Sequence, residues 1–531
     1  MPTECITNPL QRELADSIVR MAPLDDIRIL LACGAKANGP VTQGLHPLHY
    51  AVWQHYSEAV KLLLTRGADV DARDDCGYSA LHLAAEHGSG DLVALLIEHG
   101  ATVNFPPPSP RQGRRLGGRH REGRSRLVEE DDGDNEERRR DENGNEEVNR
   151  IQPAEVERQV NGDGEEERER PEVSVYVEEK LFPRTELCDE PLRLAIKNGH
   201  LEVARMLLEA GADPNRRYFF GAEINLVPPM QVDVLHLLLT YGADPDTRDR
   251  AGLTPLMKAA RLPQGIESVL LLISFGADVN ACADERNDLR SVLHYAVLSG
   301  NVATVNLLLR QGARPNFSSD YGQPTPMHLA VLRGDPEIVR LLLEAGANAN
   351  IPARVIGTPL HVACADGIPH CAEILHLLLG LGKADPNLIV DSGDGGPNLR
   401  PVLAEYLASN ENPCPIVLNL LMRYGARVVV KTQFRHPLGI LNSLTHAPNQ
   451  GPQLLLLLEA AEGYDPLMIR RSSLLTPAQK SIILAMSSRP LSLRHQCRLA
   501  IRQRMGLSLP DKVHELPLPQ ILHRYLLYEI H

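Results

Sequence analysis

Aromatic residues are scarce in this chain. Only 4% of its 531 residues are Phe, Trp or Tyr, and Trp53 is the single tryptophan, whereas Leu and Ala are abundant. Small aliphatic side chains allow short helices to pack closely, so this composition favours an α-rich solenoid over a sheet protein. Because 43% of the residues are apolar, the chain can still bury a large core.

Long apolar runs and paired cysteines are also missing. The longest runs, such as LLLLLEAA at 454–461, are far shorter than a bilayer span, and the N-terminal segment MPTECITNPLQRELADSIVR has no apolar signal region. The nine cysteines are scattered and never form a Cys-x-x-Cys pair, which favours reduced thiols. We expect a protein of the cytoplasm, or of both cytoplasm and nucleus, that is not secreted and does not insert into membranes.

Catalytic motifs are missing as well. The sequence has no phosphate-binding loop, no His-Glu-x-x-His, no Gly-x-Ser-x-Gly and no kinase signature set, so we expect no catalytic residue, no metal ion and no cofactor. The densest potential zinc cluster comprises His361, Cys364, His370 and Cys371. The repeat described below already accounts for His361 and Cys364, so core packing is the favoured interpretation.

About half of the formal net charge of −13 comes from one densely charged segment. Residues 111–126 carry seven Arg and one Glu, and residues 129–172 carry nineteen acidic and seven basic side chains. The rest of the chain has a net charge of about −7, which disfavours a nucleic-acid-binding face. We expect this segment to be a flexible, solvated loop; the alternative is an Arg-rich nuclear-import or anionic-surface signal, which the acidic run weakens.

A motif of about 33 residues recurs along the chain. It is clearest in CGYSALHLAAEHGSGDLVALLIEHGATVN at 76–104 and TPMHLAVLRGDPEIVRLLLEAGANAN at 325–350. Ser or Thr caps a first helix, Pro enters its first turn without wasting a donor, and Gly ends a second helix in the left-handed conformation. We expect the recurring first-turn histidines to tie each repeat to the next: His49, His82, His294, His328 and His361.

Two sets of markers define the period. First helices are predicted to start within tetrapeptides that begin at residues 46, 79, 190, 254, 291, 325 and 358. Second helices are predicted to end at Gly34, Gly67, Gly100, Gly211, Gly242, Gly276, Gly312, Gly346, Gly382, Gly425 and, more weakly, Gly463. Most intervals lie between 31 and 37 residues, and the pattern resembles the ankyrin repeat.

Both marker sets contain one long interval. It measures 111 residues, from 79 to 190 and from Gly100 to Gly211, and exceeds one 33-residue repeat by 78. This excess predicts an insertion at a finger loop between two adjacent repeats. The predicted organisation is N-terminal ankyrin repeats (8–104), a disordered Pro-, Arg- and Glu-rich insertion (105–182), central ankyrin repeats (183–387), degenerate ankyrin repeats (388–470) and a tail of a different kind (490–529).

Ankyrin solenoids bind partners with their finger tips and the ends of their first helices, so we expect a protein-binding face there. Trp53 is either an anchor for a partner or a plug against the N-terminal repeat. Tyr218, Phe219 and Phe220 stand where a finger should be; a rearranged local core is the favoured interpretation, and a second anchor is the alternative. The predicted substrate-binding residues at the ends of first helices are Trp53, Gln54, Glu86, His87, Lys197, Leu332 and Arg333.

The tail does not match the repeat. Leu493, Cys497 and Ile501 recur at every fourth position and form a narrow apolar stripe on a helix, with the small cysteine as a dent between larger residues. From this spacing alone, the stripe either docks a partner or caps the last repeat. Three arginines run beside the stripe, and we expect them to keep its flank solvated: Arg494, Arg498 and Arg502.

The residues that follow favour docking. The stripe, followed by the run Leu516, Pro517, Leu518, Pro519 and then by Tyr-Leu-Leu at 525–527, resembles a suppressor-of-cytokine-signalling (SOCS) box. The two prolines should hold an extended segment whose leucines stay available. With its repeats, the chain resembles the ankyrin repeat and SOCS box family. The predicted fold is an all-α solenoid of about ten to eleven ankyrin repeats with one long disordered insertion, followed by a small helical SOCS box.

The resemblance implies a non-catalytic substrate-recognition adaptor of a cullin-5-type RING ubiquitin ligase. Leu493, Cys497 and Ile501 would contact elongin C, which is joined to elongin B. Residues 516–519 would select cullin-5 with its RING subunit, and the ankyrin face would hold an unknown protein substrate for ubiquitin transfer. The alternative is an ankyrin scaffold whose C-terminal helices only cap the solenoid.

Overall fold

The structure is a computed structural model that describes residues 9–105, 189–316, 322–390, 399–410, 412–446 and 452–529. Its contacts divide the chain into two units, unit 1 with residues 1–80 and 104–190, and unit 2 with residues 81–103 and 191–531. The predicted disordered insertion lies outside the described residues except for Phe105. That side chain is buried, and the Arg73 guanidinium carbon lies 4.4 Å from its ring centre, so Phe105 still belongs to the packed repeat.

In its described part, unit 1 consists of two helix pairs. α1 (Pro9–Val19) contacts α2 (Leu24–Ala32), and α3 (Pro47–Trp53) contacts α4 (Ser57–Thr65). Leu14, Ile18 and Ile27 are fully buried in the first pair. The spacing of Leu14 and Ile18 puts both on one helical face, which is the pattern that buries an amphipathic helix.

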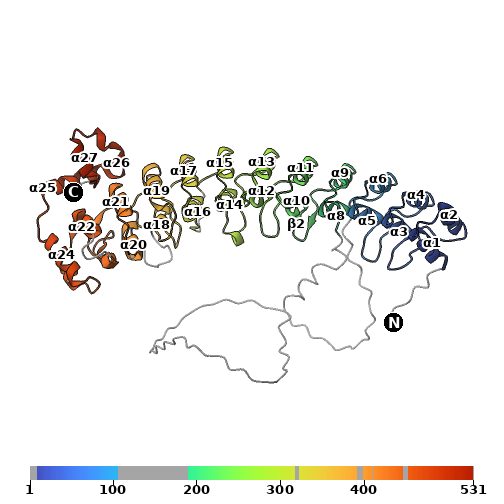
Figure 1. The fold of residues 1–531 in the computed structure, drawn as a ribbon, viewed down its shortest axis with the longest axis horizontal. Helices are drawn as coiled ribbons and strands as arrows, with labels where there is room; N and C mark the ends of the chain where they lie inside the picture. The colour runs from blue at the N-terminus through green and yellow to red at the C-terminus, as the bar shows by residue number, and fades with distance from the viewer. Residues whose placement is uncertain are drawn as a thin grey trace, which may run out of the picture. The chain divides into compact units, whose positions relative to one another are not determined.

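Unit 2 continues the pattern of helix pairs. Figure 1 shows its first helices in one row and its second helices in another. The first helices are α5 (Ala80–Glu86, in unit 2 after Ala80), α8 (Pro191–Lys197), α10 (Glu223–Leu226), α12 (Pro255–Ala260), α14 (Val292–Ser299), α16 (Pro326–Arg333), α18 (Pro359–Ala363) and α20 (Val402–Ser409). The second helices are α6 (Gly90–Glu98), α9 (Leu201–Glu209), α11 (Val232–Thr240), α13 (Ile266–Ser274), α15 (Val302–Arg310), α17 (Pro336–Glu344), α19 (Cys371–His376) and α21 (Pro415–Arg423).

The helix boundaries confirm the predicted repeat. Each tetrapeptide predicted to start a first helix does so at its second residue, as at Pro326 in α16. Most of the predicted terminal glycines have a positive φ, as Gly346 does at 84°. One predicted end is wrong, because Gly463 lies in a strand. The second helix does end at Gly382 as predicted, but this glycine has a φ of −77° rather than a left-handed conformation. The π-helical turn η3 (Leu377–Leu381) absorbs one extra residue there, so Lys383 takes the left-handed conformation instead, with a φ of 49°.

The repeats on either side of the insertion pack directly on each other. α6 contacts α9, although residues 104–190 separate them in the sequence. Asn198 Nδ2 donates to the Glu86 carbonyl at 3.2 Å, and His200 Nε2 lies 3.1 Å from the same oxygen. This close contact is the arrangement expected of an insertion between adjacent repeats.

The C-terminal part departs from the repeat gradually. The last helix pair replaces its first helix with the 3₁₀ segment η4 (Leu441–His446) and keeps α22 (Pro452–Glu459) as its second. Strand β3 (Val428–Val430) pairs in parallel with β4 (Ala461–Tyr464). Two short elements lie in fingers, the hairpin β1 (Arg217–Tyr218) and β2 (Gly221–Ala222), and η2 (Glu285–Asn287).

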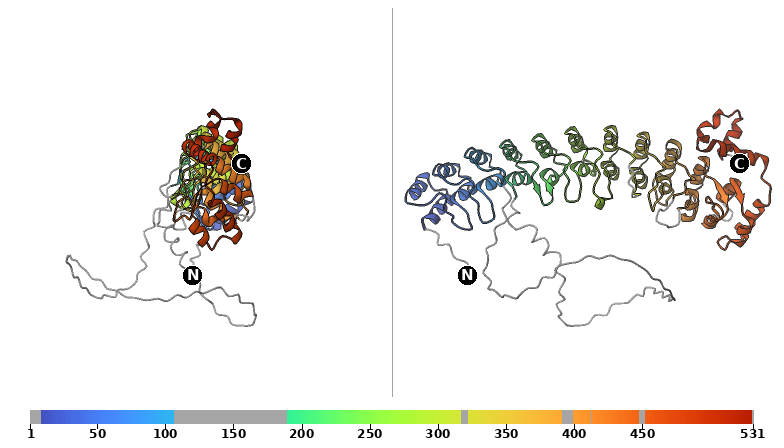
Figure 2. Two further views of the ribbon diagram at one scale, coloured as in Figure 1. Left: turned by 90° about the vertical axis from the view of Figure 1, so that its left-hand side faces the viewer. Right: turned by 180° about the vertical axis from the view of Figure 1, so that it is seen from behind.

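The tail is a separate group of short helices, preceded by two connecting helices. Figure 2 shows these segments at the C-terminal end of unit 2. The connecting helices are α23 (Pro466–Arg471) and α24 (Pro477–Ser487), and the tail comprises α25 (Leu493–Met505), η5 (Gly506–Ser508), α26 (Leu509–Lys512), η6 (Val513–Glu515) and α27 (Gln520–Leu526). Across the described ranges, every helix is too short or too polar to cross a membrane.

Buried histidines link neighbouring repeats as predicted. The Thr325 N–H donates to His328 Nδ1 at 3.1 Å, and His328 Nε2 donates to the Gly357 carbonyl of the next repeat at 2.9 Å. Because Nδ1 accepts, the ring is neutral and carries its proton on Nε2. His82 is buried at the equivalent position. The same two contacts are present at His49 within unit 1, His294 and His361.

These histidines make the stability of the array depend on pH. Burial lowers the pKa of His294 and of His328 from 6.5 to about 4. Unfolded histidines bind protons below pH 6.5 and these folded ones do not, so the stability they contribute is fully present above pH 6.5 and is lost as the pH falls towards 4. At pH 5 each such histidine costs about 2 kcal/mol of unfolding free energy.

Replacing His328 with Leu should therefore destabilise the protein less at low pH than at neutral pH. At pH 7.5 the variant should lose about 2–3 kcal/mol of unfolding free energy, because the Gly357 carbonyl and the Thr325 N–H lose their partner. When the pH falls from 7.5 to 5.0, the unfolding free energy of the variant should drop by about 2 kcal/mol less than that of the wild type, because the variant lacks this histidine. Urea unfolding at both pH values measures these free energies. An equal drop in unfolding free energy in both proteins would contradict a neutral, buried His328.

Candidate functional site

Helix α25 carries the predicted apolar stripe on one face. Ser492 caps the helix by accepting from the His495 N–H at 3.2 Å. Leu493 is 76% exposed and Cys497 is also exposed, whereas Ile501 is half-buried against the tail's own core. The stripe advances by about 40° per four residues, so its last member turns inwards. Two of its three residues thus remain accessible to a partner.

The predicted cullin-binding segment is only partly accessible. Leu516 and Leu518 pack against a small core inside the tail, so the expectation that both leucines stay available is wrong. Pro517 and Pro519 are exposed. The segment is extended at both ends, with φ and ψ of −71° and 134° at Leu516, and α27 begins directly after Pro519. The core consists of Leu509, Val513, Leu526 and Leu527, with Ile501, Met505, Leu516 and Leu518 packed against it.

A second face of α25 is occupied by its arginines, and the expectation that these stay solvated is wrong for Arg498 and Arg502. Arg498 is 3% exposed, and its guanidinium carbon lies 4.3 Å from the ring centre of Tyr525 and 4.4 Å from that of Tyr528. Arg494 lies over Tyr525 at 3.8 Å, and Arg502 over Tyr528 at 4.6 Å. We call these five side chains the arginine–tyrosine ladder. Each such contact contributes about 0.5–2 kcal/mol.

Backbone carbonyls compensate the buried charges of the ladder. Arg498 Nη2 donates to the Glu459 carbonyl at 2.7 Å, at the end of α22. Arg502 donates to the Leu526 carbonyl at 2.7 Å and to the Met422 carbonyl in α21. Burial lowers the pKa of the Arg502 guanidinium, and the two acceptors offset that desolvation. α25 is thereby attached to the last two helix pairs.

The predicted substrate-binding residues fall into separate groups. In unit 1, Trp53 is 55% exposed at the end of α3, and Gln54 beside it is half-buried. Both predicted roles of Trp53, anchor and plug, stay predictions. In unit 2, Glu86 and Lys197 are exposed at the ends of the neighbouring helices α5 and α8. His87 next to Glu86 is half-buried, and its Nδ1 lies 2.8 Å from the Leu83 carbonyl.

A third group lies at the end of α16. Leu332 and Arg333 are both exposed there. Arg333 Nη1 donates to the Leu298 carbonyl of the preceding repeat at 2.9 Å, so its position is set by the array. Several helix pairs separate this group from Glu86, His87 and Lys197 along unit 2 (Figure 1). Whether any group binds a substrate stays a prediction.

The aromatic triplet forms the tip of the β1–β2 hairpin. Phe219 and Phe220 are 43% and 59% exposed, with their ring centres 4.9 Å apart, and Arg250 lies over Phe219 at 4.3 Å. Tyr218 is half-buried, with Arg193 over its ring at 5.0 Å. Because both phenylalanine side chains are exposed, the favoured rearranged core is wrong for them. The second-anchor alternative stays a prediction.

Two more exposed apolar side chains on fingers were not predicted. Val355 lies in the finger closed by a bridge between Ala353 and Gly357, and Phe434 lies in the loop after β3. Both are almost fully exposed. The sequence signal was present, because an apolar residue at the centre of a short finger turn has no neighbour that could cover it.

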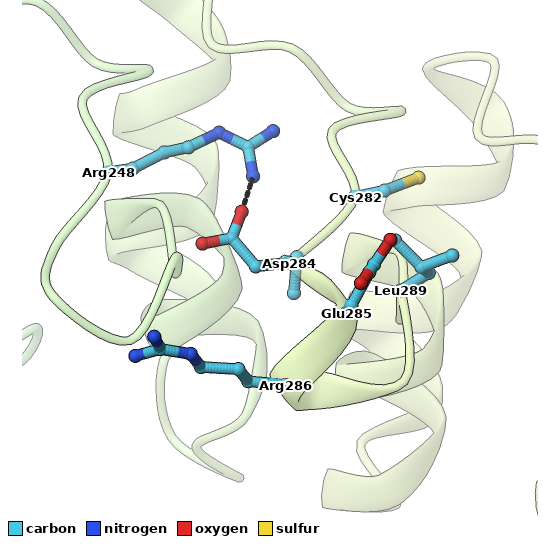
Figure 3. Close-up of a pocket in the computed structure, with 7 residues that line it drawn as sticks. Arg248, Cys282, Asp284, Glu285, Arg286 and Leu289 are labelled. Carbon is cyan, nitrogen blue, oxygen red and sulfur yellow. Dashed lines mark hydrogen bonds and ion pairs between the residues drawn. The ribbon is translucent and has the colours of Figure 1, made fainter. Parts of the chain in front are cut away.

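The fingers also enclose a hollow of about 580 Å³ in unit 2, shown in Figure 3. Arg248 and Asp284, from neighbouring fingers, form an ion pair across it at 3.1 Å. Burial raises the pKa of the Cys282 thiol, which disfavours a nucleophilic thiolate. This arrangement therefore offers a surface of mixed charge rather than an acid, base or nucleophile poised for catalysis.

The potential zinc cluster is explained by the repeat. His361 uses Nδ1 to accept from the Thr358 N–H and Nε2 to contact the Arg400 carbonyl, so neither nitrogen is left for a metal. Cys364 is buried, and burial raises the pKa of Cys371 to about 11. Within the residues that the structure describes, no group of three or more His, Cys, Asp or Glu side chains could hold a metal ion.

Comparison with protein families gives the same division of the chain. The model described as ankyrin repeats (3 copies) matches residues 22–106, 230–319 and 293–389, and the single ankyrin repeat model matches residues 190–218. The SOCS box model matches residues 489–527. The predicted fold class is therefore confirmed by the helix pairs and by these matches.

Two individual proteins are also similar to this chain. Ankyrin repeat and SOCS box protein 16 of Homo sapiens is 30% identical over 358 residues, which cover 66% of this chain and 76% of that protein. The Mus musculus protein of the same name is 30% identical over 356 residues, which cover 65% and 75%. Among solved structures, the ankyrin repeat domain of Bcl-3 is 25% identical with a TM-score of 0.36 and covers 44% of this chain and 98% of that one.

Ankyrin repeats followed by a SOCS box fit a substrate-recognition adaptor of a cullin–RING ubiquitin ligase, and proteins with this arrangement are typically non-catalytic. The SOCS box implies binding to elongins B and C and to a cullin in general. The match to the human relative extends over three quarters of that protein. In this chain the matched ankyrin repeats precede the matched SOCS box. The chain belongs to the ankyrin repeat and SOCS box family.

Proposed function

We propose that this chain is the substrate-recognition adaptor of a cullin-5 RING ubiquitin ligase. Leu493, Cys497 and Ile501 bind elongin C, residues 516–519 select cullin-5 with its RING subunit, and the ankyrin repeats hold the protein to be ubiquitinated. The observation that carries this proposal is the division of α25 into two faces. The ladder face is covered by Tyr525, Tyr528 and the last repeats, while Leu493 and Cys497 remain exposed beside it.

The adaptor acts without making or breaking a bond itself. It holds substrate lysines near the conjugating enzyme that the RING subunit recruits, so the rate gain comes from effective concentration and orientation. Neither the finger hollow nor the group of His361, Cys364 and Cys371 supports a chemical role. Burial raises the pKa of the Cys282 and Cys371 thiols, Cys364 is buried, and both nitrogens of His361 are hydrogen-bonded. This is why we propose a non-catalytic subunit.

The scaffold alternative, in which the tail only caps the solenoid, explains one face of α25. The ladder does cap the last two helix pairs through the Glu459 and Met422 carbonyls. Capping alone gives no reason for a leucine that is 76% exposed beside an exposed cysteine. Exposed apolar residues at positions i and i+4 of one helix are instead what a partner groove receives.

We also propose that the protein works in the cytoplasm, or in both cytoplasm and nucleus. The cysteines that the structure describes are free thiols, as a reducing compartment requires. The arginine-rich run at 111–126 lies outside the described residues and remains a candidate import signal.

Replacing Leu493 with Arg and Cys497 with Phe should disrupt elongin binding. Loss of one apolar anchor costs about 2 kcal/mol, so the affinity for purified elongin B–C should fall roughly 30-fold or more in biolayer interferometry. The exposed Gln503, on α25 but away from the stripe, supplies a control: Gln503→Ala should stay within about twofold of the wild type. A wild type that does not bind elongins, or a double variant that binds equally well, would refute the proposal.

Changing both prolines of the 516–519 segment to Ala should separate the two ligase contacts. Pro517 and Pro519 are exposed, so the variant should keep elongin B–C and lose about tenfold or more in affinity for cullin-5. Changing Leu516 and Leu518 to Ala should lower the thermal stability of the tail and weaken both contacts, because these side chains pack in its core. Unchanged cullin-5 binding by the proline variant would exclude this segment.

Trp53→Ala tests the substrate face. Removing an exposed tryptophan should reduce capture of a bound substrate roughly tenfold or more while elongin binding is unchanged. Proximity labelling in cells with and without proteasome inhibition measures capture, and Lys61→Ala on the second helix α4 is the matched exposed control. An identical set of labelled proteins for wild type and Trp53→Ala would remove Trp53 from the binding face.

A further inference from the structure

We propose that the arginine–tyrosine ladder fixes the angle between the elongin-binding helix α25 and the last ankyrin repeats. Arg498, Tyr525 and Tyr528 are then positioning residues that set the direction in which the ligase is held relative to the substrate. This inference rests on the proposed function, because the direction matters only if α25 carries the ligase. It adds a determinant that lies outside both docking elements.

The ladder is a continuous series of contacts along one side of α25. Its arginines stand at i, i+4 and i+8, so they share a helical face. Its tyrosines stand three residues apart, Tyr525 within α27 and Tyr528 just after it. The guanidinium of Arg498 touches both rings, which makes it the central member. Tyr525 and Tyr528 are themselves buried. The series therefore joins α25 to the end of the chain along its length rather than at one point.

The same residues reach two different elements of the last repeats. Towards α22 and β4, Arg498 donates to the Glu459 carbonyl, and His495 Nε2 lies 3.2 Å from the Ala461 carbonyl. Towards α21, Arg502 donates to the Met422 carbonyl. Two separate attachments of one helix resist both rocking and rotation, whereas a single attachment would leave it free to pivot.

The chain end is attached to α21 as well. Asn419 Nδ2 donates to the Tyr528 carbonyl at 3.3 Å, and Arg423 pairs with Glu529 at 3.4 Å. Tyr528 has a φ of 59°, a left-handed conformation that bulky residues rarely adopt and that surrounding contacts must maintain. The ring of Tyr528 is thus held from its backbone as well as by Arg498 and Arg502.

The ladder is distinct from the core that folds the tail. That core is formed by Leu509, Val513, Leu526 and Leu527 with four partly buried neighbours, and no ladder residue is among them. The elongin-facing residues Leu493 and Cys497 lie on another face. Weakening the ladder should therefore loosen the placement of α25 and leave the tail folded and able to bind elongins.

The ring faces carry the interaction rather than the tyrosine hydroxyls. Arg498 Nε is buried without a hydrogen-bond acceptor, and the two rings lie within 4.4 Å of the same guanidinium. A π face compensates such a charge without an acceptor atom. Phenylalanine should therefore replace either tyrosine, whereas leucine of similar apolar character should not, which supplies a matched pair of variants.

Pulsed electron–electron double resonance on the full chain tests the inference. Spin labels are attached through unnatural amino acids at the exposed Glu344 of α17 and Gln503 of α25, with and without elongin B–C. In the combined Tyr525→Leu and Tyr528→Leu variant the distance distribution should broaden about twofold or more, while the corresponding double Phe variant keeps the wild-type width. Elongin B–C affinity of the Leu variant should stay within about threefold of the wild type.

Two outcomes would overturn the inference. An unchanged width in the Leu variant would mean that the ladder does not set the angle of α25. Loss of elongin binding together with a broadened distribution would mean that the ladder folds the tail rather than orienting α25. Failure of the proposed function looks different, because wild-type chain would then not bind elongin B–C, while the distances in the free chain would still respond to the Leu substitutions.

Discussion

The buried guanidinium of Arg498 is the contact on which the placement of the C-terminal tail depends. An isolated amphipathic helix gains most by burying its apolar side, and for α25 that side includes Leu493 and Cys497. The structure buries the arginine side instead, because two tyrosine rings and the Glu459 carbonyl compensate the charge of Arg498. With this face occupied by the protein itself, Leu493 and Cys497 of the apolar stripe are left exposed. A cap and a docking surface are therefore two faces of one helix rather than competing explanations of it.

The repeats support that helix, and buried histidines hold the repeats together. Each neutral histidine accepts at the start of its own helix and donates to the next finger, so one side chain fixes the repeat internally and joins it to its neighbour. Stability in such arrays is the sum of the stabilities of the repeats and of the interfaces between neighbours. Each helix pair is therefore held in place by its neighbours, and unit 2 does not need one common core. The insertion does not interrupt this continuity, since α6 and α9 pack directly against each other.

Much of this arrangement could be predicted from local sequence, and the failures share one physical reason. Helix starts, terminal glycines and histidine ties follow from a few residues within one repeat, so their pattern predicted them. Three predictions were wrong. Arg498 and Arg502 are not solvated, Leu516 and Leu518 are not freely available, and Phe219 and Phe220 do not form a local core. Spacing gives the angle of a side chain on its helix, but it does not say which neighbouring element covers that angle. Tyr525 and Tyr528 lie more than twenty residues from the arginines that they cover, and only tertiary contacts bring them together.

We propose that this chain joins an ankyrin array to a cullin-5 ligase as one stoichiometric assembly. The most direct measurement is the mass, by size-exclusion chromatography with multi-angle light scattering, of the purified full chain mixed with elongins B and C, cullin-5 and its RING subunit. We expect one species whose mass equals the sum of one copy of each component. Separate elution of this chain from elongins B and C would contradict it.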